Sequence, residues 1–327
     1  MKILFCGESF PEARRQLASL LPDDEILAFP PAQLGAHIAE ADVIVPLVAR
    51  VDEDFILEGT FGLIQQYGVG LESVDIDAAT RNGVCVARIP SEESGNAASV
   101  AEHAILLLLM LSRRWNQIAG KRQKSVQVPW GSPVGQAILG KTVCVVGLGG
   151  VGREVVRRLS GFRVRIITVD DHPGRTVPGV EIAHAFTLPD LQTALADADY
   201  VILCINYMPD RHNFISRREI TAMKPGVFLV NVARGGLLDP NALLSALRTG
   251  QVAGAGLDVF WEEPVDWSHP LFRENVIATP HIAGVTDVSY EGIARAFAEN
   301  MRRYAAGETL LYLANAPADH RSFKPHR

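Results

Sequence analysis

Three polar residues in the second half of the chain have types that could carry chemistry. Arg234, Glu263 and His281 each follow an apolar segment that is typical of a β-strand. An arginine can hold a carboxylate by two parallel hydrogen bonds and can polarise a neighbouring carbonyl. A histidine beside a carboxylate is held in one tautomer and can exchange a proton with an alcohol or ketone near neutral pH. Such a set could bind a small acid and move a proton on it.

Each of these residues also has an interpretation without chemistry. Arg234 could be a surface arginine in a Gly-Gly turn, His281 a structural histidine, and Glu263 a solvated loop acid. In an open α/β sheet, however, ligands bind beyond the carboxyl ends of the strands. Because all three residues follow strand-like segments, we expect them to converge on one ligand site.

A glycine motif in the middle of the chain indicates a nucleotide site. The β-branched run 143–146 leads into Gly147, Gly149 and Gly152 at G-x-G-x-x-G spacing, and a helical pattern follows. Gly147 permits a tight turn, Gly149 lets a pyrophosphate approach the backbone, and Gly152 lets the helix pack on the strand. Glycine-rich hairpins can show this spacing too. Asp170, however, closes a second apolar run at the spacing expected for a carboxylate that binds an adenosine ribose, which favours a dinucleotide.

The two sets of residues complement each other. A dinucleotide moves a hydride, an arginine binds a carboxylate, and a histidine moves a proton. This combination predicts the interconversion of a 2-hydroxy acid and a 2-keto acid. We expect no metal ion in the reaction.

The alternation of strand-like and helical segments predicts the elements that position these residues. Apolar strands at 3–6, 43–48 and 63–66 alternate with helical patterns up to Pro90, and this rhythm is typical of a parallel α/β sheet. A second series starts at the glycine motif. Its strands are expected near Val143, Arg165, Val201, Val227, Val252 and Val276.

The length of 327 residues is large for one core, and about two domains are expected. We predict an α/β fold of two Rossmann-like, doubly wound parallel-sheet domains. A nucleotide-binding domain at 95–284 is inserted into a discontinuous substrate domain at 1–94 and 285–327. Helices at about 95–118 and about 286–304 join the two, a long exposed connection covers about 120–140, and the cleft between the domains is the expected ligand site.

Composition excludes several classes of protein. The hydrophobic content of 48% and the formal charge of −6 are those of a globular protein without a nucleic-acid or membrane partner. The apolar stretch 104–111 is far too short to span a membrane, and the first residues form a strand instead of a signal peptide. The four cysteines lie in or beside apolar runs without C-x-x-C spacing, which favours a reduced, cytoplasmic protein. Residues 316–327 are expected to form a loose tail.

Nearly the whole chain resembles the D-isomer-specific 2-hydroxyacid dehydrogenases. The segment 94–103 (Ser-Gly-Asn-Ala-Ala-Ser-Val-Ala-Glu-His) is similar to the family's entry to the interdomain helix. Segments 231–236 (Asn-Val-Ala-Arg-Gly-Gly), 254–260 with 262–264 (Glu-Glu-Pro), and 279–284 (Thr-Pro-His-Ile-Ala-Gly) resemble its arginine, acid and histidine motifs. These motifs are specific in combination.

The resemblance implies roles at the matching positions. Arg234 would bind the substrate carboxylate and orient the carbonyl. His281 would be the general acid in reduction and the general base in oxidation, with Glu263 as its partner. The backbone N–H groups of Val69 and Gly70 would bind the substrate carboxylate.

The resemblance also implies a cofactor site. Asp258 would bind the nicotinamide carboxamide, and Asp170 would bind the adenosine ribose and repel a 2′-phosphate, so NAD is expected over NADP, although Arg175 lies close along the chain. The expected cofactor-binding residues are Gly147, Gly149, Gly150, Val151, Gly152, Asp170, Cys204, Ala233, Asp258, His281 and Gly284.

The chain departs from the family pattern in two places. Where relatives usually have Pro-Leu-Thr-Pro, residues 206–209 are Asn-Tyr-Met-Pro. That loop lies near the cofactor in the family, so the departure is expected to affect the cofactor affinity and the adjoining pocket wall. Gly150 stands where many members carry a larger polar residue, which should alter only the phosphate edge.

The expected activity is reduction of a small 2-keto acid, similar to glyoxylate or hydroxypyruvate, to the D-2-hydroxy acid, or the reverse oxidation. D-3-phosphoglycerate or phosphite oxidation remains an alternative. Against phosphoglycerate, the chain is short for the appended regulatory domain of many such enzymes, and segment 46–49 offers an apolar pocket edge with only Arg50 nearby. Formate oxidation is disfavoured because the family's formate enzymes lack the acid at Glu263. A dinucleotide-sensing protein similar to the C-terminal-binding corepressors is the non-enzymatic alternative.

A homodimer is expected from the resemblance. In the family, the helix that begins near Asn96 and the loop through Trp130 help to form a two-fold dimer, and exposed apolar character around Trp115 and Trp130 would suit such an interface. Packing of both tryptophans within their own subunit is the alternative.

Overall fold

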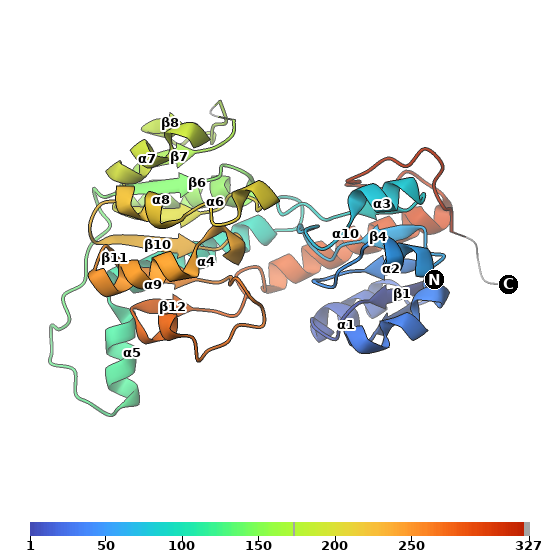
Figure 1. Ribbon diagram of the computed structural model, residues 1–327, viewed down its shortest axis with the longest axis horizontal. Coiled ribbons are helices and arrows are strands. Elements are labelled where there is room, and N and C mark those ends of the chain that lie inside the picture. Colours follow the sequence, from blue (N-terminus) through green and yellow to red (C-terminus); the bar gives the residue numbers. More distant parts are fainter. Residues whose placement is uncertain (173, 324–327) are drawn as a thin grey trace. The chain divides into compact units, whose positions relative to one another are not determined.

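The computed structural model describes residues 1–172 and 174–323. The chain forms two compact units, of which one contains residues 1–96 with 286–327 and the other contains residues 97–285. Figure 1 shows that each unit is built from a sheet with helices beside it. The last four residues of the predicted substrate domain, 324–327, lie outside the described residues.

The first unit contains a five-stranded parallel sheet with the strand order β2-β1-β3-β4-β5. Its strands are β1 (Lys2–Phe5), β2 (Glu25–Ala28), β3 (Val43–Val45), β4 (Leu63–Gln65) and β5 (Cys85–Ala87). Its helices are α1 (Pro11–Leu20), η1 (Pro31–Ala36), η2 (Ile38–Glu40), α2 (Glu53–Glu58), α3 (Ile76–Arg81) and α10 (Asp287–Ala306), and α4 (Asn96–Ser112) begins at its boundary.

The alternation of side chains along these strands creates one core on each face of the sheet. Ile3 and Phe5 point into a cluster that contains Phe297 of α10, whereas Leu4 points into a second cluster with Ile56 of α2. Successive residues of a strand face opposite sides, so a strand that is apolar at every position must be covered on both faces. This is why helices flank the sheet on both sides.

The second unit contains a seven-stranded parallel sheet with the order β12-β11-β10-β9-β6-β7-β8. Its strands are β6 (Thr142–Val146), β7 (Arg165–Val169), β8 (His184–Phe186), β9 (Tyr200–Leu203), β10 (Val227–Asn231), β11 (Val252–Leu257) and β12 (Val276–Ala278). Its helices are α4, α5 (Trp115–Gln123), α6 (Gly150–Leu159), η3 (Ser160–Phe162), η4 (Leu188–Asp190), α7 (Leu191–Asp197), η5 (Pro209–Arg211), α8 (Arg217–Ala222), η6 (Gly235–Leu237), α9 (Pro240–Thr249) and η7 (Pro270–Arg273).

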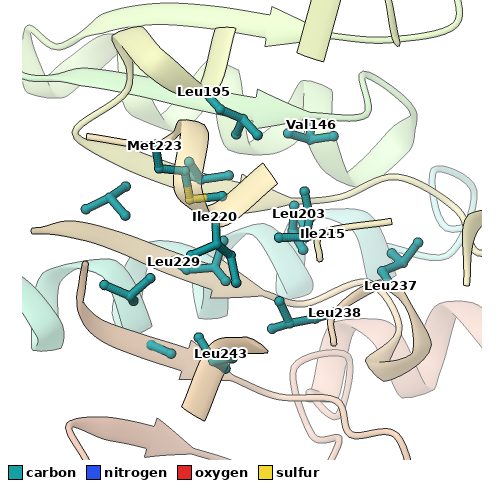
Figure 2. Packing of buried hydrophobic residues seen from close by; sticks show 14 of the residues in the cluster. Val146, Leu195, Leu203, Ile215, Ile220, Met223, Leu229, Leu237, Leu238 and Leu243 are labelled. Carbon is teal, nitrogen blue, oxygen red and sulfur yellow. The ribbon is translucent and has the colours of Figure 1, made fainter. Parts of the chain in front are cut away.

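The second sheet is also doubly wound. Cys144 and Val146 of β6 belong to the core under α7, α8 and α9, and Val143 and Val145 belong to the core under α4 and α6. Figure 2 shows part of the first of these cores, in which Leu195, Ile220 and other apolar side chains pack together. The α/β class with two parallel-sheet domains is therefore confirmed.

The prediction of one long helix at about 95–118 is wrong. Helix α4 ends at Ser112 and α5 starts at Trp115, because Arg114 adopts a left-handed backbone conformation with φ of 55°. The carbonyl of Ser112 accepts a hydrogen bond from Gln136 N at 2.7 Å. A distant segment therefore ends the helix. The expected exposed connection accordingly starts later than predicted, after α5.

The prediction of a loose C-terminal tail is wrong for residues 316–323, and 324–327 lie outside the described residues. Arg321 N donates to Gly83 O at 2.7 Å, and Arg321 Nη1 donates to Gly59 O at 3.0 Å. A Cβ on Gly62 would lie 2.2 Å from Arg321 O, and one on Gly83 would lie 2.5 Å from Asp319 O. Glycines in the first unit thus create the room in which this segment packs.

The described helices give no sign of a membrane span. Among them, none combines the length and the apolar character that crossing a bilayer requires.

Candidate active site

The order of the second sheet places the three expected catalytic residues at one edge. Strands β10, β11 and β12 are adjacent and parallel, so their carboxyl ends meet at the same edge. Arg234, Glu263 and His281 lie in the segments that follow these three strands in turn. The strand ends therefore bring them to the edge where ligands bind in open α/β sheets.

Glu263 and His281 form a close pair. His281 Nδ1 lies 2.6 Å from Glu263 Oε2, and Glu263 Oε1 accepts a hydrogen bond from Phe260 N at 2.9 Å. Burial raises the pKa of Glu263, but the hydrogen bond and charge of His281, the Phe260 N–H and the charge of Arg234 outweigh it and hold the pKa below its usual value. The carboxylate is thus ionised and fixes one nitrogen of the imidazole. Nε2 is then the nitrogen left for a further hydrogen bond.

Arg234 is held at the end of β10 by its backbone. The buried Asn231 side chain donates from Nδ2 to Arg234 O at 2.9 Å and accepts from Ala233 N at 3.1 Å. Gly235 follows, and a Cβ there would lie 1.9 Å from the carbonyl carbon of Phe260. This close approach brings the arginine turn against the segment that leads to Glu263, and the charge of Arg234 contributes to the lowered pKa of Glu263.

Asp258 lies beneath the loop that carries His281. Its side chain is 1% exposed, and its carboxylate accepts hydrogen bonds from Ile282 N and Ala283 N, each at 2.9 Å. His281 N donates in the opposite direction, to Asp258 O at 2.7 Å. Asp258, which is expected to bind the nicotinamide carboxamide, therefore also holds the loop that carries His281. A carboxylate has about four acceptor positions, so Oδ2 keeps capacity for a further donor.

The glycine turn has the geometry that its spacing predicts. Gly147 has φ of 95°, and a Cβ on Gly152 would lie 1.9 Å from Gly147 O, so both positions require glycine. Around Gly149, by contrast, no described atom other than those of its chain neighbours lies within 4 Å of the place where a Cβ would stand. The N-cap of α6 is Gly149, which has no side chain to cap the helix that starts at Gly150. The open space and the helix N-terminus fit a pyrophosphate.

Asp170 lies beside this turn at the end of β7. Its carboxylate, 8% exposed, accepts from Leu148 N at 2.6 Å and from His172 N at 2.8 Å, and Arg175 Nη1 lies 3.2 Å from Oδ1. The acid thus holds the glycine turn and meets Arg175. A carboxylate at this strand end, next to a turn that leaves room for a pyrophosphate, fits the adenosine ribose of a dinucleotide.

The remaining expected cofactor residues line the same strand ends. Cys204 follows β9 with its N–H on Val146 O at 2.8 Å, and burial raises the pKa of its thiol to about 12, so it forms a wall and is no nucleophile. Ala233 precedes Arg234, and Gly150 and Val151 form the first turn of α6. Gly284 lies in a turn closed by a hydrogen bond from Val285 N to Ile282 O at 2.8 Å.

The departing segment 206–209 is fastened by an arginine. Arg211 donates from Nη1 to Asn206 Oδ1 at 2.7 Å and from Nη2 to Asp171 Oδ2 at 2.6 Å. Because β6 lies between β7 and β9, this bridge links the loops on both sides of the glycine turn. Tyr207 lies over the arginine turn, since a Cβ on Gly236 would lie 2.8 Å from its ring.

Val69 and Gly70 lie in the first unit, in the loop after β4. The buried side chain of Gln66 donates from Nε2 to Gly70 O at 2.6 Å and to Leu47 O at 2.9 Å. Gly68, with φ of 135°, accepts from Ile89 N at 2.8 Å. The loop whose N–H groups are expected to bind a carboxylate is thus held rigidly from within its unit.

Several residues that hold these groups in place had no predicted role. Gln66 and Asn231 each lie three positions before a residue singled out for chemistry, and Arg211 follows the departing segment 206–209. A polar side chain at the end of an apolar strand was the available signal for Asn231 and Gln66. The bridge from Arg211 to Asp171 forms because the order of the strands brings two distant loops together. No local sequence pattern predicts it.

The fold and the site define a class of protein before any comparison. The second unit has a doubly wound parallel sheet with a glycine turn after strand β6 and an acid at the end of the neighbouring strand β7. An arginine, a glutamate and a histidine follow strands β10, β11 and β12. This arrangement is that of a dinucleotide-dependent oxidoreductase.

Comparison with known proteins narrows the class. Residues 105–283 match the family model for the NAD-binding domain of the D-isomer specific 2-hydroxyacid dehydrogenases. The chain is 34% identical over 297 residues to a glyoxylate reductase of Thermococcus litoralis, covering 88% of this chain and 87% of that protein. It is 37% identical over 284 residues to a D-3-phosphoglycerate dehydrogenase of Mycobacterium leprae, covering 84% of this chain but 51% of that protein. It thus spans about half the length of the latter.

A solved structure agrees with this. The D-lactate dehydrogenase of Aquifex aeolicus, complexed with NAD and lactic acid, matches with a TM-score of 0.83 and 25% identity, covering 94% of this chain and 96% of that one. The chain belongs to the D-isomer specific 2-hydroxyacid dehydrogenase family, as its motifs predict. It is an NAD-dependent dehydrogenase that interconverts 2-keto and 2-hydroxy acids.

Proposed function

We propose that the protein reduces a small 2-keto acid, of the size of glyoxylate or hydroxypyruvate, to the D-2-hydroxy acid. The observation that carries this proposal is the pair of His281 and Glu263, 2.6 Å apart, with Arg234 close enough to lower the pKa of Glu263. Identity to a glyoxylate reductase along most of both chains supports the substrate class.

The catalytic roles follow from the chemistry of these side chains. Arg234 binds the substrate carboxylate and stabilises the negative charge that develops on the carbonyl oxygen. His281 donates the proton from Nε2 to that oxygen, and Glu263 stabilises the imidazolium and fixes the ring. NADH, when bound, supplies the hydride. The backbone N–H groups of Val69 and Gly70 bind the carboxylate in the same proposal.

The cofactor roles belong to the proposal as well. The glycine turn and the first turn of α6 hold the pyrophosphate, Asp170 holds the ribose, and Asp258 binds the carboxamide. Cys204, Ala233 and Gly284 form the surrounding wall. In this scheme residues 95–284 form the NAD domain, and residues 1–94 with 285–327 form the substrate domain.

Oxidation of D-3-phosphoglycerate is the second candidate, because a relative with that name is 37% identical. A phosphate on the substrate would need a basic partner. Arg50 is the nearest basic residue along the chain to the apolar edge at 46–49, and its Nε lies 3.2 Å from Asp52 Oδ2. This pairing favours a substrate without a phosphate.

A panel of keto acids tests the proposal. NADH oxidation is followed with glyoxylate, hydroxypyruvate, pyruvate and 3-phosphohydroxypyruvate, with phosphite assayed in the reverse direction. We expect the highest kcat/KM with one of the small unphosphorylated acids. A preference for the phosphorylated acid or phosphite would overturn the substrate class, and the absence of turnover with every member would favour a dinucleotide-sensing protein.

A variant tests the role of the histidine. His281→Gln should nearly abolish turnover and leave the affinity for NADH almost unchanged, because the amide cannot carry the proton. NADH affinity is measured by quenching of tryptophan fluorescence. Retained turnover in this variant would refute the assignment.

We also infer a cytoplasmic homodimer. Trp130 is fully exposed and Trp115 is 44% exposed, and Val134 on the same connection is also exposed, which suits an isologous interface. Light scattering at micromolar concentration should give twice the mass of one chain, and a monomer would remove the dimer from the proposal.

The cysteines bear on the location of the protein. All four are free, which supports a reducing compartment. Cell fractionation tests the cytoplasmic location.

A further inference from the structure

A line of hydrogen bonds connects α4 to the loop of His281. His103 Nε2, on α4, lies 2.8 Å from Thr279 Oγ1, and Thr279 Oγ1 donates to Asp258 Oδ1 at 2.7 Å. All three residues belong to the second unit. None of them reacts with substrate in the proposed mechanism, and neither His103 nor Thr279 has a role in it.

The direction of the protons follows from the last member of the line. The Asp258 carboxylate accepts from Ile282 N and Ala283 N as well as from Thr279. The Thr279 hydroxyl has a single proton, which it gives to Asp258, so its oxygen must accept from His103. His103 therefore carries a hydrogen on Nε2. Its side chain is 14% exposed, so water competes little for this bond.

The line ends on the backbone of the catalytic loop. The two amides that Asp258 holds belong to the residues directly after His281, and the carbonyl of Asp258 accepts from His281 N at 2.7 Å. His281 has φ of 53°, in the left-handed region, which few residues other than glycine adopt without support. The carboxylate and carbonyl of Asp258 thus hold this conformation from both sides.

We propose that His103 and Thr279 are positioning residues for the proposed reaction. They fix the rotamer of the Asp258 carboxylate, and through it the backbone of residues 281–283, so that the imidazole keeps Nδ1 on Glu263 and Nε2 on the substrate. The inference rests on the proposed function of His281. It adds two residues that act without touching substrate or cofactor.

Variants of Thr279 separate positioning from general packing. Thr279→Val keeps the shape of the side chain but can neither donate to Asp258 nor accept from His103, whereas Thr279→Ser keeps the hydroxyl. We expect Thr279→Val to lower kcat on the order of tenfold. Thr279→Ser should retain most of the kcat, even if both variants lose thermal stability.

A second pair of variants tests the start of the line. His103→Gln keeps a side-chain N–H donor, and His103→Leu removes it. We expect kcat to fall several-fold in His103→Leu and to recover in His103→Gln. This pair of variants also tests the proposal if Thr279→Val fails to fold.

A measurement without turnover completes the test. Hydrogen–deuterium exchange reports the amides of Ile282 and Ala283 directly, and we expect them to exchange faster in Thr279→Val and His103→Leu than in the parent and the Ser and Gln variants. Equal kcat and equal exchange in Thr279→Val and the parent would overturn the proposal. So would equal losses of kcat in the Val and Ser variants.

The two levels of inference fail in different ways. If the parent protein reduces no 2-keto acid, the proposed function fails, while amide exchange still reports whether the line holds the loop. If the parent is active and the variants match it, only the positioning inference fails.

Discussion

Removing the charge of Glu263 gives the sharpest test of how the site works. Glu263→Gln keeps the size of the side chain, removes its negative charge and leaves one oxygen where two accept hydrogen bonds, from Phe260 N and from His281 Nδ1. Since the pKa of Glu263 is below its usual value, the parent residue is ionised throughout the neutral range. The variant therefore removes a charge that is present during the assay.

The size of the effect follows from the distance and the exposure. The two charges are 2.6 Å apart, and the side chains of His281 and Glu263 are 44% and 30% exposed, so solvent screens them strongly. With the dielectric constant of water, Coulomb's law gives about 1.6 kcal/mol at this distance. At about 1.4 kcal/mol for each factor of ten in rate, this corresponds to a change of roughly tenfold in kcat/KM.

The direction of the change is also fixed. In the oxidation of a 2-hydroxy acid, His281 takes up the substrate proton, and the carboxylate stabilises the positive charge that develops on the imidazole. Without the carboxylate, kcat/KM for oxidation should fall roughly tenfold, which is measured by following NADH absorbance.

A neighbouring acid provides the matched control. Glu262→Gln removes the same charge from an exposed position one residue away and should leave kcat/KM nearly unchanged. If Glu263→Gln also leaves kcat/KM nearly unchanged, the electrostatic argument is refuted.

Two further predictions concern the cofactor site. Gly149→Ala should keep the melting temperature and weaken NADH binding about tenfold, because its Cβ meets open space where a pyrophosphate is expected. Gly152→Ala should instead destabilise the fold by about 3 kcal/mol, because its Cβ would lie 1.9 Å from Gly147 O. Thermal unfolding and NADH titration distinguish the two variants, and equal melting temperatures would contradict the argument. Arg211→Met should weaken NADH binding several-fold and leave the KM for the keto acid unchanged, because the bridge to Asp171 is lost; an unchanged affinity would show that the bridge does not shape the site.

Much of the fold could be predicted from the sequence, because its strands are buried on both faces. A run such as 143–146 is apolar at every position, and the glycines after it have requirements that no other residue meets. The short strands β2 and β8 escaped prediction, since each is partly exposed and carries no such run. The strand-end rule also indicated that Arg234, Glu263 and His281 would lie at one edge.

The errors came from contacts that are distant along the chain. Arg113 and Arg114 are good helix formers, so nothing local marks the end of α4, where Arg114 is left-handed and Gln136 N donates to Ser112 O. The polar composition of 316–323 is typical of a loose tail, and only the room left by Gly62 and Gly83 allows it to pack. Similarly, the burial of Asp258 and its bonds to the histidine loop follow from tertiary structure alone.

The discontinuity of the first unit has a consequence for the order of biosynthesis. Phe297 and Met301 of α10 are fully buried against the sheet of strands β1 to β5, yet they are made after every residue of the second unit. While the chain emerges from the ribosome, Phe5 and its neighbours on that face remain uncovered until α10 appears, whereas the second unit is complete once residue 285 has emerged. The part that is translated first is therefore the part that finishes folding last.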